Sequence, residues 1–173
     1  RFLLKFSLGY PSPTEEKAIL RRFQRANPLD DLPAVIEAAD LLAMQRTCRD
    51  VFVGEPVEDY VVELVRASRA HPAIELGASP RGTLGLYQAA QALAAIGGRS
   101  YVIPDDVKRL APAVLSHRLI ASAQARLRGH SIAEIVAEVL ASVPVPVEDD
   151  LPVAPGTLAQ SRMADQSADR AGG

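Results

Sequence analysis

The sequence has 173 residues, of which 48% are hydrophobic, and its formal net charge is −2 at pH 7. This length suffices for one domain with a core, alone or followed by a tail, and the near-neutral charge argues against general nucleic-acid binding, which needs a basic excess. No apolar run is long enough to cross a membrane, and the single cysteine, Cys48, lacks a partner for an internal disulfide, which favours a reducing, cytoplasmic location.

The first nine residues predict a β-strand. The stretch "RFLLKFSL" is rich in apolar residues that favour strands and alternates only partly with polar ones, which is typical of a mostly buried strand. A single strand cannot satisfy its backbone hydrogen bonds alone. We therefore expect residues 1–9 to be the last strand of a sheet whose other strands lie upstream of Arg1.

About six helices are expected after this strand. The clearest follows Pro56, where apolar residues recur at positions i, i+3, i+4, i+7 and i+8 from Val57 onward. A helix that begins at Pro104 should kink or break at Pro112, because proline removes a helix hydrogen bond. The other helices are expected at residues 14–26, 38–49, 80–96 and 131–142.

The last part of the chain has a different composition. Residues 143–173 are rich in Pro, Asp, Ala and Gly and show little periodicity, so they bury too little apolar surface to offset the entropy of ordering. The sequence therefore predicts an all-α fold, with a helical bundle over 10–142, a stub strand at 1–9 and a disordered tail at 143–173.

The motifs of a self-contained active site are missing from the sequence. It contains no G-x-x-x-x-G-K-[ST] phosphate loop, no G-x-S-x-G and no H-E-x-x-H. The three histidines, His71, His117 and His130, are too scattered along the chain to indicate a metal site, so no metal ligand is expected. The pair Asp105–Asp106 is better explained as part of a helix start. We expect this chain alone to be inactive as an enzyme.

Arg81 is the candidate functional residue. Ser79 and Pro80 predict the N-cap and first position of a helix, which places Arg81 in a first turn, where the helix dipole disfavours a cation. Gly77 and Gly82 flank it and permit a close neighbour. A guanidinium beside free backbone N–H groups suits a phosphate. The alternative is an arginine that simply extends into solvent.

Several stretches resemble the MoxR family of AAA+ ATPases. The motif "GASPRG" at 77–82 is similar to the sensor 2 motif of that family, and "RFLLKFSLGYPSPTEEKAIL" at 1–20 resembles the end of its ATPase core and the start of its lid. The stretches "DLLAMQ", "VEDYVVELVRASRAHPAIELGASPRG" and "RSYVIPDDVKRLAPAVLSHRL" resemble successive segments of the lid. The resemblance covers about residues 1–120, with the motifs in matching order and spacing.

This resemblance implies a fragment made of the last core strand and the helical lid of an AAA+ ATPase. ATP and Mg²⁺ would be bound mainly by the core upstream of Arg1. Arg81 would contact the terminal phosphates as the sensor 2 residue, with Ser79, Pro80 and Gly82 shaping its turn. Arg1 resembles the arginine of the L-D-R-F stretch of the family, a candidate arginine finger that acts on a neighbouring subunit, although the preceding Leu and Asp are absent here.

The resemblance also implies a function for the parent protein. Its lid would pack on its own core in a homo-oligomeric ring, a hexamer by family precedent, in which ATP hydrolysis drives chaperone-like remodelling or activation of partner proteins. Proteins with von Willebrand factor A domains are the implied partners. The residues leave open a non-catalytic helical interaction module with no nucleotide role. A helical DNA-binding domain is disfavoured by the net charge.

Overall fold

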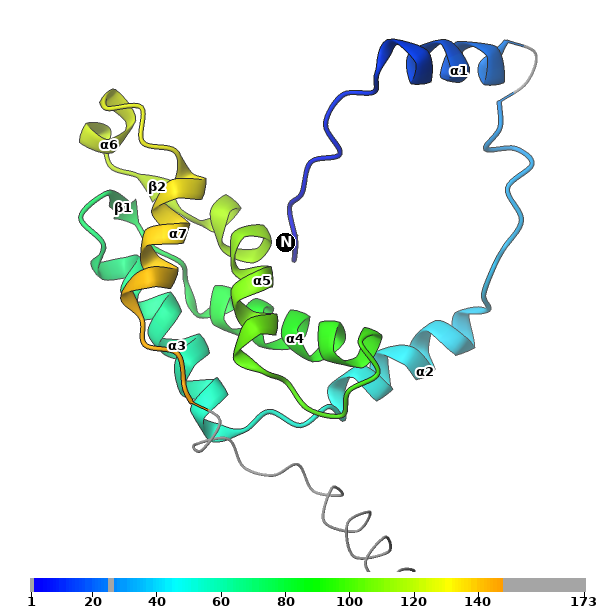
Figure 1. Ribbon diagram of the computed structural model, residues 1–173. Helices are drawn as coiled ribbons and strands as arrows, with labels where there is room; N and C mark the ends of the chain where they lie inside the picture. Colours follow the sequence, from blue (N-terminus) through cyan, green and yellow to red (C-terminus); the bar gives the residue numbers. More distant parts are fainter. Residues whose placement is uncertain (1, 25–26, 148–173) are drawn as a thin grey trace, which may run out of the picture. The chain divides into compact units, whose positions relative to one another are not determined.

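The computed structural model describes residues 2–24 and 27–147 of the chain (Figure 1). The chain divides into two compact units. The larger unit combines Arg1–Lys5 with Thr47–Gly173, and the smaller unit is Phe6–Arg46. The helical part of the larger unit carries the candidate site.

The smaller unit contains α1 (Pro13–Phe23) and most of α2 (Ala38–Arg49). Ser12 and Glu15 form a capping box at the start of α1, in which the Ser12 amide donates to the Glu15 carboxylate over 2.7 Å and lowers the pKa of Glu15. Neither helix has a buried residue within the described part of the chain. These two helices therefore form without a core of their own.

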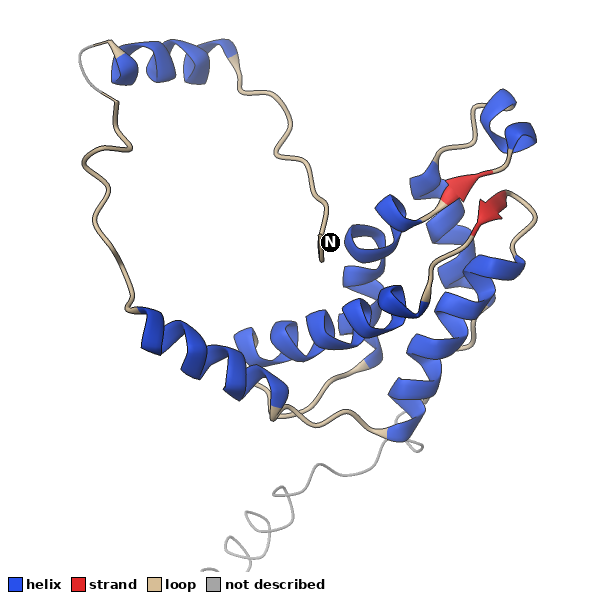
Figure 2. Cartoon of the chain, turned by 180° about the vertical axis from the view of Figure 1, so that it is seen from behind, coloured by secondary structure: helices blue, strands red, loops and turns tan. Residues whose placement is uncertain are grey.

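Most of the larger unit is helical (Figure 2). Its longer helices are α3 (Glu55–Ala70), α4 (Pro80–Ile96), α5 (Pro104–Leu115) and α7 (Ile132–Ser142), with a short α6 (Ala123–Leu127) between the last two. Two short strands, β1 (Ile74–Leu76) and β2 (Ile120–Ala121), pair antiparallel, with Ile74 opposite Ala121. The predicted all-α class is confirmed, whereas α6 and the small sheet were not expected from the sequence.

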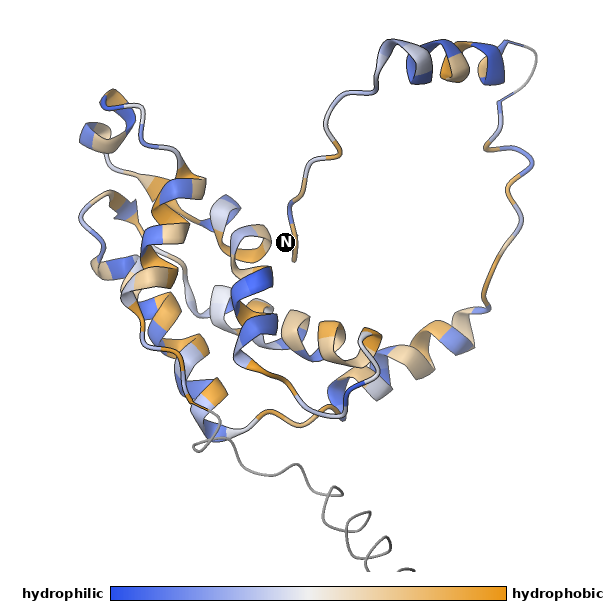
Figure 3. Ribbon diagram, viewed as in Figure 1, coloured by the Kyte–Doolittle hydropathy of each residue, from blue (hydrophilic) through white to orange (hydrophobic). Residues whose placement is uncertain are grey.

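The core of the larger unit is aliphatic and centres on α3. The five apolar positions predicted to share one face of this helix are all buried, and Leu64 and Val65 are completely inaccessible to solvent. Hydrophobic and hydrophilic residues are interspersed along α3, as expected for a helix with one apolar and one polar face (Figure 3). From α7, the buried side chains of Ile135, Val136 and Val139 join the same core. The apolar face of the last helix thus packs within this unit.

Three polar residues of the larger unit are buried among the described residues, and two of them, Gln91 and Asp106, hold neighbouring segments through hydrogen bonds. The Gln91 amide of α4 donates to the carbonyls of Val51 and Arg49, over 2.8 and 3.2 Å, and so fastens the segment before α3 to α4. Asp106 accepts two hydrogen bonds from Arg99, at 2.7 and 2.6 Å, and one from the Ile103 amide. Asp106 is therefore a helix-start residue, as its position in the sequence indicated.

Of the kink or break expected at Pro112, the break does not occur. Helix α5 continues through Pro112 to Leu115, and a 3₁₀ turn (Ser116–Arg118) follows. Pro112 lies within one turn of the helix end, so it removes one hydrogen bond without separating two helices. Beyond it, the carbonyls of Ala113 and Val114 accept from the Lys5 amide and from Arg118 Nε, each over 2.9 Å.

The expected N-terminal strand is not formed within this chain. Residues 4–10 have no regular secondary structure, and Lys5 N–Ala113 O is the backbone bond that joins this stretch to the larger unit. A strand needs a neighbouring strand for its hydrogen bonds, and the described residues offer none here. The assignment of 1–9 to a core sheet stays a prediction. The predicted disordered tail lies mostly outside the described residues, from 148 onward.

The position of Leu64 generates a prediction for stability. We expect Leu64→Ala to lower the free energy of unfolding by about 2–5 kcal/mol, because it leaves a cavity at the centre of the core. The matched control is Val62→Ala on the exposed side of the same helix, where 41% of the residue is accessible, with a change of about 0.5 kcal/mol or less. Urea unfolding followed by circular dichroism measures both. Equal losses would contradict this assignment of the core.

Candidate functional site

The candidate site is the turn that leads from β1 into α4 and carries Arg81. Ser79 occupies the N-cap position in an extended conformation, Pro80 is the first helical residue, and the Gly82 amide donates to the Ser79 carbonyl over 2.7 Å. The predicted start of this helix is therefore confirmed. The Ser79 side chain, however, makes no capping hydrogen bond, so the first-turn amides of α4 keep no side-chain acceptor from the N-cap.

Two neighbouring residues of α3 hold this turn through the backbone of Ala78. The buried Ser68 hydroxyl accepts from the Ala78 amide over 3.1 Å and donates to the Val65 carbonyl over 2.7 Å. Arg69 Nε donates to the Ala78 carbonyl over 2.7 Å. The peptide groups on both sides of Ala78 are thus fixed on α3. Sequence reasoning missed Ser68 and Arg69, because their partners are main-chain groups nine and ten residues away, which leave no local pattern.

Gly77 is required by the close approach of this turn to α3. A Cβ atom at Gly77 would lie 2.6 Å from Arg69 Cα and 2.8 Å from Arg69 N, distances that no side chain can occupy without a backbone shift. At Gly82, a Cβ would lie 3.1 Å from Ala78 Cβ. The sequence indicated a close neighbour at both glycines. That neighbour is the protein itself, because Gly77 packs on α3 and Gly82 packs within the turn.

Arg81 is exposed, and its side chain forms no hydrogen bond or ion pair with another described residue. The first turn of α4 contains no acidic residue, whereas α1, α3, α5 and α7 each begin with at least one. A free guanidinium with its forked donors thus stands at the positive end of a helix whose amides lack a side-chain cap. Such a corner can bind an anion with phosphate or carboxylate geometry.

Of the other candidate residues, three lie within the described part of the chain and Arg1 does not. Ser79, Pro80 and Gly82 lie in the turn with Arg81, as the sequence predicted, and act there through backbone conformation and packing. Arg1 lies outside the described residues, so its assignment as an arginine finger stays a prediction.

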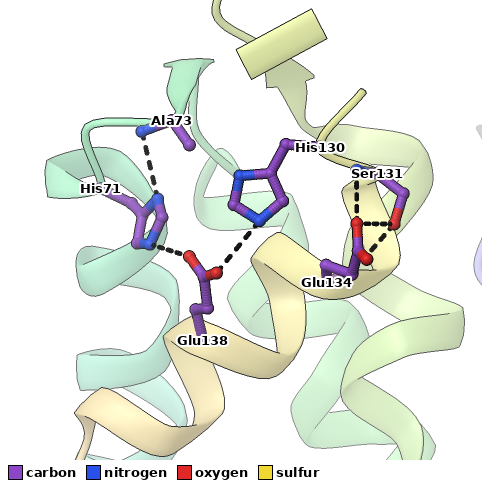
Figure 4. A network of polar contacts seen from close by, with 6 residues as sticks. All are labelled: His71, Ala73, His130, Ser131, Glu134 and Glu138. Atoms are coloured by element: carbon purple, nitrogen blue, oxygen red, sulfur yellow. Dashed lines mark hydrogen bonds and ion pairs between the residues drawn. The ribbon is translucent and has the colours of Figure 1, made fainter. Parts of the chain in front are cut away.

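Two of the three histidines meet at a second polar cluster (Figure 4). His71 Nε2 and His130 Nε2 lie 3.2 and 3.0 Å from the two carboxylate oxygens of Glu138, and His71 Nδ1 accepts from the Ala73 amide. The sequence separated these histidines, but the fold brings them together. Each imidazole contacts a different oxygen, and among the described residues no group of three or more His, Cys, Asp or Glu side chains is arranged to hold a metal ion.

This cluster fixes α7 in place. Glu138 joins α7 to the loop after α3 and to His130, which directly precedes the N-cap of α7. One turn earlier, the Ser131 amide donates to the Glu134 carboxylate over 2.8 Å, which lowers the pKa of Glu134. The cluster bridges α7 to the end of α3, and the anion-binding corner at Arg81 is the stronger candidate for a functional site.

Comparisons with known proteins identify the region around this corner. The profile of the AAA lid domain matches residues 66–139, which include α4 and α5. The chain is 40% identical to the uncharacterized protein YeaC of Bacillus subtilis, over 86% of this chain and 46% of that protein. It is 37% identical to the chaperone MoxR1 of Mycobacterium tuberculosis, over 88% of this chain and 42% of that protein.

A solved structure shows the same fold. The crystal structure of a candidate ATPase from Cytophaga hutchinsonii superposes with a TM-score of 0.75 at 30% sequence identity, over 85% of this chain and 47% of that one. The chain spans about half the length of the curated relatives that it matches.

The packing of Gly77 generates a prediction for the site. Gly77→Ala should lower the free energy of unfolding by about 1–3 kcal/mol, because the added methyl group forces the turn away from α3. Ser79→Ala is the matched control in the same turn, and it should change stability by about 0.5 kcal/mol or less because its hydroxyl makes no cap bond. Urea unfolding separates the two. A loss for Ser79→Ala as large as that for Gly77→Ala would contradict the described turn.

Proposed function

Since this chain is the lid region of a MoxR-type AAA+ ATPase, we propose that Arg81 is its sensor 2 residue and contacts the terminal phosphates of ATP. The observation that carries this proposal is the exposed guanidinium, without a partner among the described residues, in the first turn of α4. The turn below it is fixed to α3 by Ser68 and Arg69. A cation held in this way is available to a ligand and does not need to leave a protein partner first.

The chemistry proposed for Arg81 is electrostatic. The nucleotide and Mg²⁺ would be bound mainly by the core of the parent protein, where the metal would supply charge neutralisation at the phosphates. Arg81 adds a forked pair of donors at the γ-phosphate, where negative charge must be stabilised during phosphoryl transfer. Because the turn is fixed to α3, a contact between Arg81 and the phosphate would draw the helices of the lid with it. The position of the lid would then depend on the nucleotide state.

At the level of the whole parent protein, we propose ATP hydrolysis in a homo-oligomeric ring, a hexamer, that remodels or activates partner proteins. The name of the Mycobacterium tuberculosis relative, a chaperone, supports the chaperone-like part. Proteins with von Willebrand factor A domains remain the proposed partners, and Arg1 the proposed arginine finger. A cytoplasmic location is proposed from the single cysteine. Within the described residues, no helix has both the length and the apolar character needed to cross a membrane.

The sensor role predicts the effect of removing the guanidinium. In the full-length parent, Arg81→Ala should lower the rate of ATP turnover at least about tenfold, because a charge contact to the transition state is lost. Thermal stability should hardly change, since the exposed Arg81 side chain forms no hydrogen bond or ion pair with another described residue. The matched control is Arg109→Ala on α5, another exposed arginine that has no described partner. Unchanged turnover in a folded Arg81 variant would reject the sensor role and favour a non-catalytic interaction module.

The isolated chain should release no measurable phosphate from ATP and should bind nucleotide only weakly. The reason is that its sequence contains no phosphate loop to hold the β- and γ-phosphates. A phosphate-release assay with the purified chain, beside the full-length parent at equal concentration, tests this expectation. Robust hydrolysis by the chain alone would overturn the assignment of the nucleotide site to the rest of the parent.

A further inference from the structure

The segment Phe2–Lys5 lies on the corner formed by α4 and α5, and Arg118 holds it there. Arg118 Nη2 donates to the carbonyls of Phe2 and Leu3, over 2.8 and 3.4 Å. At the far end of the segment, the Lys5 amide donates to the Ala113 carbonyl over 2.9 Å. These contacts lie within the larger unit, to which residues 1–5 belong.

Arg118 forms a hydrogen bond with α5 and packs against α4. Its Nε donates to the Val114 carbonyl over 2.9 Å, so that one guanidinium satisfies the end of α5 and the carbonyl of Phe2 together. On α4, a Cβ at Gly85 would lie 3.2 Å from Leu3 Cδ1 and 3.5 Å from Arg118 Nη2. The missing side chain at Gly85 therefore makes room for both Leu3 and the guanidinium.

His117 adds a second contact to the same carbonyl. Its Nε2 lies 3.3 Å from Phe2 O, while its Nδ1 is buried without a partner among the described residues. The tautomer with the proton on Nε2 donates to Phe2 and leaves no N–H on the buried Nδ1. Phe2 and Leu3 have little other anchorage, since 76% and 44% of their surfaces remain accessible. The hydrogen bonds from the 3₁₀ turn therefore hold this segment more than burial does.

We propose that Arg118 is a positioning residue, which couples the segment Phe2–Lys5 to α4, the helix that carries Arg81 in its first turn. The link is short, because Gly82, the residue after Arg81, also faces Arg118, with its Cβ position 3.6 Å from Arg118 Cδ. The polypeptide that leads into the lid and the sensor turn are then fastened to one rigid corner. A displacement of Arg81 by nucleotide is passed to the segment Phe2–Lys5, which directly follows Arg1. This inference rests on the proposed function of Arg81.

The tether itself is tested on this chain by hydrogen exchange. Arg118→Ala should speed exchange of the Lys5 amide by about tenfold, because hydrogen bonds from a charged donor are lost. Arg118→Lys is the milder variant: it keeps the charge but cannot bond Val114 and Phe2 as a planar fork. Amides of α3 should stay protected in Arg118→Lys, and Arg109→Ala should leave Lys5 unchanged. Unchanged exchange of Lys5 in a folded Arg118 variant overturns the tether.

The coupling is tested by ATP turnover of the full-length parent with Arg118→Lys, Arg81→Ala and both together. We expect a severalfold loss for Arg118→Lys that disappears when Arg81 is already alanine, because both act through one contact. A purely structural role predicts that the two losses multiply, and that result overturns the coupling. If Arg81→Ala alone leaves turnover unchanged, the proposed function and the coupling fail together, whereas the exchange of Lys5 still decides the tether.

Discussion

The attachment of Ala78 to α3 determines where the candidate site lies. The Ser68 hydroxyl accepts a hydrogen bond from the Ala78 amide, and Arg69 Nε donates one to the Ala78 carbonyl. The chain must therefore leave α3, turn through β1 and return to pack against the same helix. Gly77 is the residue that permits this return. Because α4 begins directly afterwards, its first turn and Arg81 inherit their position from α3. The rigid part of the site is thus the backbone of Ala78, held on α3, and the Arg81 guanidinium projects from the helix that follows.

Local patterns in the sequence predicted the longer helices and the place of Arg81, but not the short α6. The spacing of Val57, Val61 and Leu64 identified the buried face of α3, and Ser79–Pro80 identified the start of α4. What supports the site could not be predicted in this way, because Arg69 and Arg118 donate to main-chain carbonyls, which every residue has. The contacts of His71 and His130 with Glu138 likewise depend on how α7 returns to α3. Contacts of this kind follow from the tertiary fold alone.

The glycines of α4 serve packing rather than ligand access. Gly82 and Gly85 bring α4 close to α5 and to the 3₁₀ turn, where Arg118 completes the hydrogen bonding of the end of α5. The same guanidinium donates to Phe2, so one side chain joins the end of α5 to the distant N-terminal segment. The last carbonyls of α5, which no helix amide can reach, receive donors from outside the helix. At this corner, the Arg118 side chain bonds to main-chain carbonyls, and the Lys5 amide adds a backbone hydrogen bond to Ala113.

Because several side-chain donors bind main-chain carbonyls, substitutions should be tolerated unequally along the sequence. Arg69, Gln91 and Arg118 recognise carbonyls, so substitutions at the accepting positions, such as Ala78, Val51 and Phe2, leave these bonds intact if the new side chain fits. The donors have no such freedom, since no other residue type offers the same reach and geometry. Homologous chains at about 40% identity can thus diverge on the accepting side and keep the same architecture. Evolutionary constraint is expected to fall unequally on the two partners of each bond.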